Sequence, residues 1–305
     1  MIDLTTNISG VSFSNPVFVA SGTFGYGTEL PEVNVSALGA IITKSVTRYP
    51  REGNPPPRIV ESASGMINSI GLANVGIEEC IRTMFPRFDH LGTKVILNVA
   101  GSTIEEYLSV VNLVERVSSS IVGYEINISC PNVKQGGMEF GVDHDLTARL
   151  TAALREKTER LLIMKLSPNV TDIVSIAKAA ENAGADALSA INTIVGMSID
   201  SDSWRSNIYT TYGGLSGSAI KPVGLAAVHK IFRKVRIPVI GIGGIVDVKD
   251  TVEYLLAGAT AIEVGSANFR NPHTAPQIVP ELINYLREKK LKSVKDLIGK
   301  VIINS

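Results

Sequence analysis

One segment shows how the chain is organised: Gly123-Tyr124-Glu125-Ile126-Asn127-Ile128-Ser129-Cys130-Pro131-Asn132. Polar and apolar residues alternate from Tyr124 to Ile128, and the β-branched side chains among them predict a β-strand. Pro131 has no backbone N–H to offer a strand ladder, so the strand is expected to end at Cys130. In a β/α barrel the carboxyl end of such a strand points into the active site, which makes Cys130 the first candidate for a functional residue.

Eight short segments are rich in apolar and β-branched residues, which predicts strands. They are Pro16 to Ser21, Ala40 to Ser45, Lys94 to Ala100, Gly123 to Ser129, Leu161 to Ser167, Ala187 to Asn192, Ile237 to Gly243 and Ala261 to Gly265. Segments with helical periodicity lie between most of them, namely Ile77 to Phe88, Thr103 to Ser118, Leu146 to Arg160, Thr171 to Ala183, Pro222 to Lys234, Val248 to Ala257 and Pro276 to Lys289. This alternation favours one (β/α)8 TIM barrel domain over residues 1–305, rather than a doubly wound sheet.

Composition and charge exclude several classes of function. The chain has 305 residues, and its 29 Lys and Arg residues balance its 29 Asp and Glu residues, so no net field recruits nucleic acid or an anionic membrane. The first residues do not have the pattern of a signal peptide, and no apolar run reaches the ~18 residues of a membrane span, so we expect a cytoplasmic protein. Two cysteines, Cys80 and Cys130, and four scattered histidines predict no metal or iron–sulfur site.

Three connections are too long to be plain links between elements. They run from Thr47 to about Gly76, from Pro131 to Val142 with a possible hinge at Gly136-Gly137, and from Thr193 to about Ser218. All three follow predicted strand ends. A barrel enzyme uses extra chain at this face to bind its substrate, so these connections predict a substrate site there.

Two glycine turns close the last two predicted strands. Gly241-Ile242-Gly243-Gly244 and Gly265-Ser266 leave backbone amides exposed ahead of helices, and barrels often bind phosphate at this place. The alternative is that these glycines only turn the chain. The first turn lacks the third glycine of a dinucleotide fingerprint, so the phosphate of a mononucleotide fits better than NAD.

Lysines and asparagines recur at the predicted strand ends. Burying the ammonium group of Lys44 or Lys165 requires an anion, which could be a substrate carboxylate, a reduced flavin, a group beside a Schiff base, or simply Glu125 or Glu263. Four amide side chains would suit a planar ligand with carbonyl and N–H groups, although a single asparagine is usually a turn residue. These four are Asn68, Asn98, Asn127 and Asn192. Cys130 could be reactive or could only pack in the core.

Several motifs occur in one order along nearly the whole chain. Besides the two glycine turns, they are Ala20 to Gly25, Thr43 to Thr47, Gly53 to Arg58, Asn68 to Leu72, Asn127 to Asn132, Ile191 to Thr193 and Gly213 to Gly217. With these motifs the sequence resembles the class 1 dihydroorotate dehydrogenases, FMN-binding barrels of pyrimidine synthesis. Cys130 stands where the membrane-associated class has serine. Three segments have sequences most similar to the NAD-linked 1B subclass, namely Thr23 to Gly27, Gly53 to Arg58 and Asn68 to Leu72.

The resemblance implies a role for each matching residue. It implies that FMN contacts Ser21, Lys44, Ser45, Asn98, Asn127, Lys165, Ile191, Gly217, Gly243, Gly244, Gly265 and Ser266. It implies that dihydroorotate contacts Lys44, Asn68, Ser69, Ile70, Gly71, Leu72, Asn127, Asn192 and Thr193. Cys130 would be the base that removes a proton from substrate C5, while a hydride passes from C6 to the flavin.

The 1B resemblance also implies partners. Electrons would leave through a separate subunit that carries FAD and a 2Fe-2S cluster, and a homodimer of this chain would form a heterotetramer with two such subunits. Three alternatives stay open: a fumarate-using class 1A homodimer, a flavin-free barrel that forms a Schiff base on Lys165 or Lys44, and a phosphate-binding barrel without catalysis.

Overall fold

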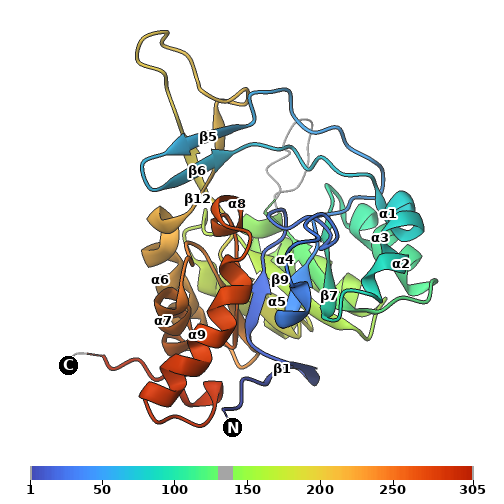
Figure 1. Ribbon diagram of the computed structural model, residues 1–305. Coiled ribbons are helices and arrows are strands. Elements are labelled where there is room, and N and C mark those ends of the chain that lie inside the picture. The colour runs from blue at the N-terminus through green and yellow to red at the C-terminus, as the bar shows by residue number, and fades with distance from the viewer. Residues whose placement is uncertain (1, 130–139, 304–305) are drawn as a thin grey trace.

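Eight parallel strands close into a barrel in the computed structural model, which describes residues 2–129 and 140–303 (Figure 1). In chain order they are β3 (Val17–Val19), β4 (Ala40–Ile42), β7 (Lys94–Ala100), β8 (Ile121–Asn127), β9 (Leu161–Leu166), β10 (Ala187–Ala190), β13 (Val239–Ile242) and β14 (Ala261–Val264). Each strand pairs with the next one along the chain, and β14 pairs with β3 to close the barrel. The predicted (β/α)8 architecture is therefore confirmed.

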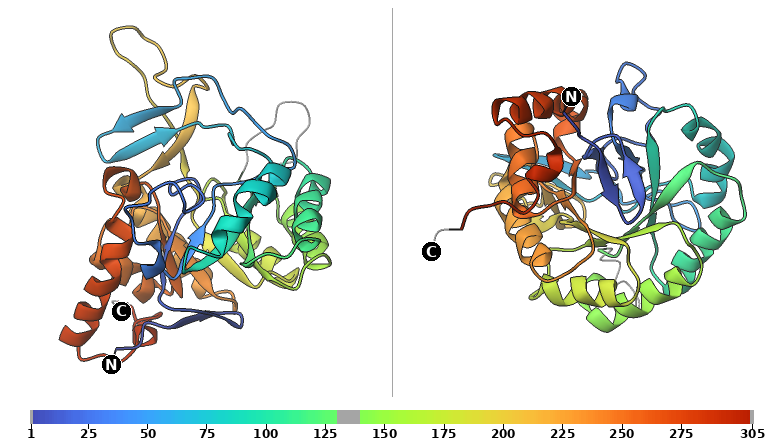
Figure 2. Two further views of the ribbon diagram at one scale, coloured as in Figure 1. Left: turned by 45° about the vertical axis from the view of Figure 1, so that its right-hand side comes forward. Right: turned by 90° about the horizontal axis from the view of Figure 1, so that it is seen from below.

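Helices surround the barrel, and the view from below in Figure 2 shows them as a ring outside the strands. They are α1 (Ile77–Thr83), α2 (Phe85–Phe88), α3 (Ile104–Glu115), α4 (His144–Arg155), α5 (Ile173–Asn182), α6 (Lys221–Phe232), α7 (Val248–Ala257), α8 (Ala267–Arg270) and α9 (Thr274–Glu288). Four single turns of 3-10 helix are η1 (Val35–Ala37), η2 (Phe140–Val142), η3 (Ser218–Ile220) and η4 (Val294–Asp296).

Local sequence explains where several helices begin and end. The Thr103 side chain accepts a hydrogen bond from Glu106 N and caps α3, and Asp172 Oδ1 accepts from Val174 N in the same way at α5. The predicted helix from Ile77 to Phe88 is wrong as one element, because it divides into α1 and α2. Pro86 lies in the first turn of α2, where its missing N–H is tolerated, but it could not continue a preceding helix.

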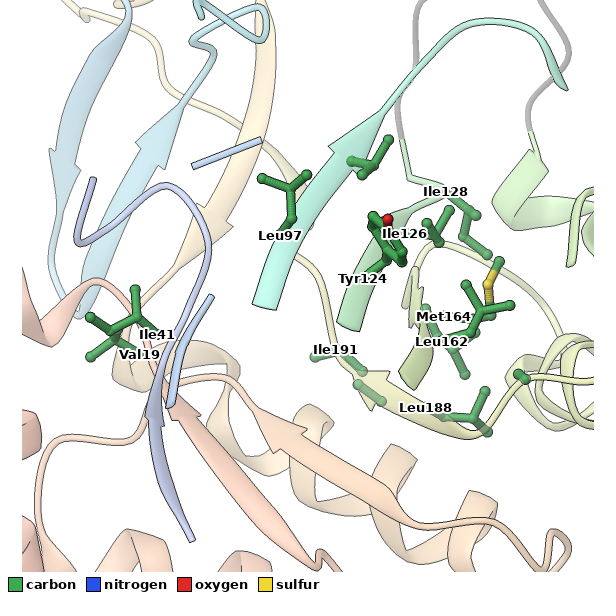
Figure 3. Close-up of a cluster of buried hydrophobic side chains, with 14 of the residues drawn as sticks. Val19, Ile41, Leu97, Tyr124, Ile126, Ile128, Leu162, Met164, Leu188 and Ile191 are labelled. Carbon is green, nitrogen blue, oxygen red and sulfur yellow. The ribbon is translucent and has the colours of Figure 1, made fainter. Parts of the chain in front are cut away.

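The barrel strands bury both of their faces. Outward side chains pack against the helices in the larger hydrophobic cluster, and Figure 3 shows Leu97, Tyr124 and Leu162 of this cluster on adjacent strands. Inward side chains near the amino ends of the strands form a second cluster with Ile8 and Phe13. These two residues come from a hairpin of β1 (Thr6–Ile8) and β2 (Val11–Phe13), which plugs the barrel at that end. Only the carboxyl end of the barrel is left for a binding site.

A second sheet lies above the carboxyl ends of the barrel strands (Figure 1). Its antiparallel strands are β5 (Ile59–Ser62), β6 (Gly65–Asn68), β11 (Ile194–Met197) and β12 (Tyr212–Ser216), in the order β11-β12-β6-β5. They belong to the first and third long connections, for which the sequence predicts no strands. Leu215 pairs with Ile67, which joins the two connections into one structure.

Residues 131–139 of the second long connection, including the predicted hinge Gly136-Gly137, lie outside the described residues. Among the residues that are described, no helix combines the length and the apolar character needed to span a membrane.

Candidate active site

A cavity of about 540 Å³ opens between the carboxyl ends of the barrel strands and the second sheet. Every site residue that the sequence predicts, apart from Cys130, lines this cavity. These residues are Ser21, Lys44, Ser45, Asn68, Ser69, Ile70, Gly71, Leu72, Asn98, Asn127, Lys165, Ile191, Asn192, Thr193, Gly217, Gly243, Gly244, Gly265 and Ser266. The volume lies within the usual range for small-molecule and cofactor sites.

The glycine turns form one end of the cavity. Gly244 has a φ of +69°, and a Cβ atom there would lie 2.8 Å from the carbonyl oxygen of Gly217. Only glycine fits this position without strain. Lys221 and Asp250 form an ion pair at 2.5 Å, and Asp250 Oδ2 also accepts a hydrogen bond from Val246 N, which fixes the chain just after the turn. The second turn, Gly265-Ser266, leads directly into α8.

A buried polar layer lies beneath the cavity. Lys165 Nζ lies 3.1 Å from Glu125 Oε1 and 3.5 Å from Glu263 Oε2, and both glutamates are 0% exposed. Asn98 Nδ2 and Ser189 Oγ donate hydrogen bonds to Glu125 at 2.6 and 2.7 Å. The sequence offers several candidate anions for pairing with Lys165, and the structure places two of them, Glu125 and Glu263, beside its ammonium group. Because Lys165 also lines the cavity, its charge can act on a ligand as well.

Burial and charge pairing shift the pKa values in this layer. Burial alone would lower the pKa of Lys165, but attraction to Glu125 and Glu263 outweighs it and raises that pKa. Burial opposes ionisation of Glu125, yet the Lys165 ammonium group and its hydrogen-bond donors hold its pKa below the usual value. Burial and the negative charge of Glu125 raise the pKa of Glu263 well above the usual value.

Lys44 is a second cation on the cavity wall. It is partly buried and forms no ion pair with any other described residue. Burial lowers the pKa of its ammonium group, and Glu29 only partly opposes this effect. The neighbouring Ser45 Oγ donates to Asn98 Oδ1 at 2.5 Å, which ties the end of β4 to the polar layer. An anionic ligand group would supply the counter-charge that Lys44 lacks.

Amide side chains form another part of the wall. Asn127 Oδ1 accepts hydrogen bonds from Asn192 Nδ2 at 3.1 Å and from Ser129 N at 3.2 Å. Within the described part of the chain, these contacts leave Asn127 Nδ2 available to a ligand. Tyr107 Oη donates to the backbone oxygen of Asn127 and fixes the end of β8 from outside the barrel. The arrangement can therefore orient a ligand edge that carries hydrogen-bond acceptors.

The first long connection is held firmly over the cavity. Asn54 Nδ2 donates to Ser69 Oγ at 3.0 Å, and Asn54 N donates to the backbone oxygen of Ile70 at 3.0 Å. Gly71 and Leu72 have positive φ values of 75° and 56°. These contacts give residues 68–72 one defined conformation at the cavity wall.

The predicted base, Cys130, lies outside the described residues. The two residues before it, Ile128 and Ser129, line the cavity. Cys80, by contrast, is fully buried on α1, and burial raises the pKa of its thiol to about 12, as expected for a cysteine that only packs in the core.

Several cavity residues are not among the predicted ones. Asn169 follows β9, donates from Nδ2 to the backbone oxygen of Thr193, and accepts from Val195 N. Its polar side chain near a strand end is a signal that could have identified it. Met66, Tyr212 and Phe269 also line the cavity, and the sequence offers no comparable signal for Met66 and Phe269. Over residues 2–129 and 140–303, no group of three or more His, Cys, Asp or Glu side chains is suited to hold a metal ion.

Fold and site together define a (β/α)8 barrel with a cavity at its carboxyl face, lined by glycine turns at one end and by two lysines. The family model for dihydroorotate dehydrogenase matches residues 3–286, and the chain belongs to that family.

Similar proteins agree with this assignment. The dihydroorotate dehydrogenase B (NAD(+)) catalytic subunit of Bacteroides thetaiotaomicron is 46% identical over 300 residues, which covers 98% of this chain and 99% of that protein. The protein of the same name from Geobacter sulfurreducens is 49% identical over 298 residues, 97% of each chain. The crystal structure of DHODH from Eimeria tenella in complex with ferulenol superimposes with a TM-score of 0.81 at 25% identity, covering 98% of this chain and 88% of that one.

Proposed function

We propose that the chain is the catalytic subunit of an NAD-linked dihydroorotate dehydrogenase, which oxidises (S)-dihydroorotate to orotate in de novo pyrimidine biosynthesis. The observation that carries this proposal is that the same cavity gathers every described residue that the family pattern assigns to cofactor or substrate. The relatives named dihydroorotate dehydrogenase B (NAD(+)) support the NAD-linked subclass over the fumarate-using one. The proposal treats residues 1–305 as one catalytic domain in the cytoplasm.

The cavity fits FMN at both ends. The turns at Gly243-Gly244 and Gly265-Ser266 offer backbone amides to a phosphate, and the surface at Gly265, where an added Cβ atom would meet only the Ala20 Cβ at 3.8 Å, allows close approach. At the other end, Lys165, Asn98 and Asn127 can meet the carbonyl and nitrogen edge of a flat ring. Bound FMN would supply the acceptor for the substrate hydride. FAD and a 2Fe-2S cluster belong only to the proposed partner subunit.

Substrate binding is assigned to Lys44 and the amide wall. The Lys44 ammonium group has no protein counter-ion among the described residues, so we assign it to an anionic group of the ligand. Asn127, Asn192 and Thr193 would orient the amide edge of the ring, and residues 68–72 would cover it from the second sheet. Holding the substrate in one orientation lowers the entropic part of the barrier.

Cys130 is assigned the role of base. Oxidation of dihydroorotate removes a proton from C5 and a hydride from C6, so a base must stand across the substrate from the acceptor. The chain reaches Cys130 directly from Ile128 and Ser129, which line the cavity. No other cysteine can take this role, because Cys80 is buried in the core.

The proposal includes the assembly that the 1B resemblance implies. A homodimer of this chain would join two electron-transfer subunits in a heterotetramer, and NAD⁺ would be reduced on those partners. The words "catalytic subunit" in the names of the relatives support a separate partner.

The alternative of a Schiff base on Lys165 is disfavoured by its surroundings. A lysine attacks a carbonyl only as the neutral amine, whereas the two glutamates stabilise the ammonium form of Lys165. Lys44, whose pKa is lowered, would be the better nucleophile. Borohydride trapping tests this alternative directly, since a substrate adduct on Lys44 would favour it.

An acceptor assay tests the proposal. The purified chain is incubated with dihydroorotate and an artificial dye, fumarate or NAD⁺, and orotate is measured. We expect orotate with the dye, none with fumarate, and NADH only after an iron–sulfur flavoprotein partner is added. Turnover with fumarate would instead indicate the 1A subclass. NAD⁺ reduction by an assembly of this polypeptide alone would contradict the proposed partner.

A further inference from the structure

Lys165 is assigned a contact with the flavin ring in the proposed reaction, but Glu125 and Glu263 beneath it contact neither cofactor nor substrate in that proposal. Glu125 and Glu263 are both 0% exposed, and they share the single ammonium group of Lys165. One positive charge cannot balance two ionised carboxylates, and an unbalanced charge in a protein interior is costly. One of the two carboxyl groups must therefore be neutral.

The hydrogen bonds of Glu125 identify it as the ionised member. Its Oε1 accepts from Asn98 Nδ2 at 2.6 Å and from Lys165 Nζ at 3.1 Å. Its Oε2 accepts from Ser189 Oγ at 2.7 Å. Three donors, one of them charged, point at this carboxyl group, which is the environment that stabilises a carboxylate.

Glu263 has a different environment. Its Oε2 lies 3.5 Å from Lys165 Nζ, and its Oε1 is buried with no hydrogen-bond partner among the described residues. The residues that pair with Glu263 in the neighbouring strands, Ile242 and Phe18, are apolar and buried. A buried carboxyl group with so few donors is most stable when it carries a proton and is neutral.

We propose that Glu263 carries this proton in the resting protein and is a positioning residue for Lys165. Glu125 supplies the one counter-charge. The neutral Glu263 acid accepts a hydrogen bond from the Lys165 ammonium group, but it adds no second negative charge that would cancel the effect of this ammonium group on the cavity. The layer is then neutral overall. If Glu125 lost its charge, the proton would leave Glu263, which would become the counter-ion in its place. Where it concerns the flavin, this inference rests on the proposed function.

Infrared spectroscopy of the chain at neutral pH tests where the proton lies, because a protonated carboxyl group has a C=O stretch distinct from that of a carboxylate. We expect this band in the wild type, its loss in Glu263→Gln, and its retention in Glu281→Gln, a control on an exposed position. Glu125→Gln should also lose the band, because Glu263 then ionises. A band that survives in Glu263→Gln, or a wild type without one, would overturn the proposal.

The reduction potential of bound FMN provides a second, functional readout. Glutamine is neutral like the protonated acid, so Glu263→Gln should change the ratio of affinities for reduced and oxidised flavin by less than about twofold. The double variant Glu125→Gln/Glu263→Gln removes the only counter-charge of Lys165, and it should favour reduced flavin by about tenfold, or ~30 mV for a two-electron couple.

A tenfold shift in Glu263→Gln alone would show that Glu263 is ionised and would overturn the proposal. So would a double variant with the wild-type affinity ratio. A chain that binds no FMN would refute the proposed function instead, and the infrared bands would still decide where the proton lies.

Discussion

Replacing Lys165 with methionine should destabilise the barrel in a pH-dependent way. The substitution leaves the Glu125 carboxylate buried without its cation. The lost attraction across 3.1 Å is roughly 5 kcal/mol at an effective dielectric constant of about 20. Glu125 can escape this cost by taking up a proton, which costs ~4 kcal/mol at pH 7 for a carboxyl group with a reference pKa of ~4.3. Protonation is the cheaper route, so it sets the upper limit of the effect.

The sign of the pH dependence follows from the same step. In Lys165→Met the pKa of Glu125 rises above its unfolded value, so the stability deficit is small near pH 4 and grows as the pH rises. We expect a loss of ~3–4 kcal/mol at pH 7 and only ~1 kcal/mol at pH 5, since each pH unit is worth ~1.4 kcal/mol.

Urea unfolding followed by circular dichroism at both pH values measures this loss, after any bound flavin is removed so that ligand binding does not add to stability. Lys178→Met, at an exposed position on α5, is the matched control and should be neutral at both pH values. A Lys165→Met deficit that is equal at pH 5 and pH 7, or larger at pH 5, would refute the reasoning.

Three further substitutions separate binding, folding and chemistry. Gly244→Ala forces a Cβ atom to within 2.8 Å of a backbone oxygen at a φ of +69°, so it should cost ~1–3 kcal/mol of stability in urea unfolding and weaken FMN binding in a fluorescence titration. Lys44→Met should raise the Kd for orotate by about 10–100-fold, the range for one hydrogen bond to a charged group, with little loss of stability; an unchanged Kd would remove Lys44 from the substrate site. Cys130→Ala should keep the flavin but lose most substrate oxidation in a steady-state assay, whereas intact activity would mean that the cysteine only packs.

The barrel can be predicted from the sequence because its signals are local. Buried strands such as Lys94–Ala100 are mostly apolar, and helices such as Val248–Ala257 have their own periodicity and caps; both ranges agree with the structure. The convergence of the predicted site residues also follows from topology, because the carboxyl ends of all barrel strands meet at one face.

The second sheet could not be predicted in this way. It pairs Met66 with Ser216, two residues from connections 150 positions apart, and its strands contain glycines that usually indicate loops. The sequence alone also could not show which anions pair with Lys165, because only the register of β8, β9 and β14 brings Glu125 and Glu263 to the same ammonium group. Interactions set by register between distant strands leave no pattern in a single sequence.

The proposed function is tested most directly by an anaerobic visible absorption spectrum of the purified chain, recorded before and after dihydroorotate is added. We expect a flavin spectrum that bleaches when the substrate is added, because the hydride from C6 reduces the bound cofactor. A flavin spectrum that dihydroorotate leaves unchanged would contradict the assigned substrate. A colourless chain that cannot be reconstituted with FMN would contradict the proposed chemistry altogether.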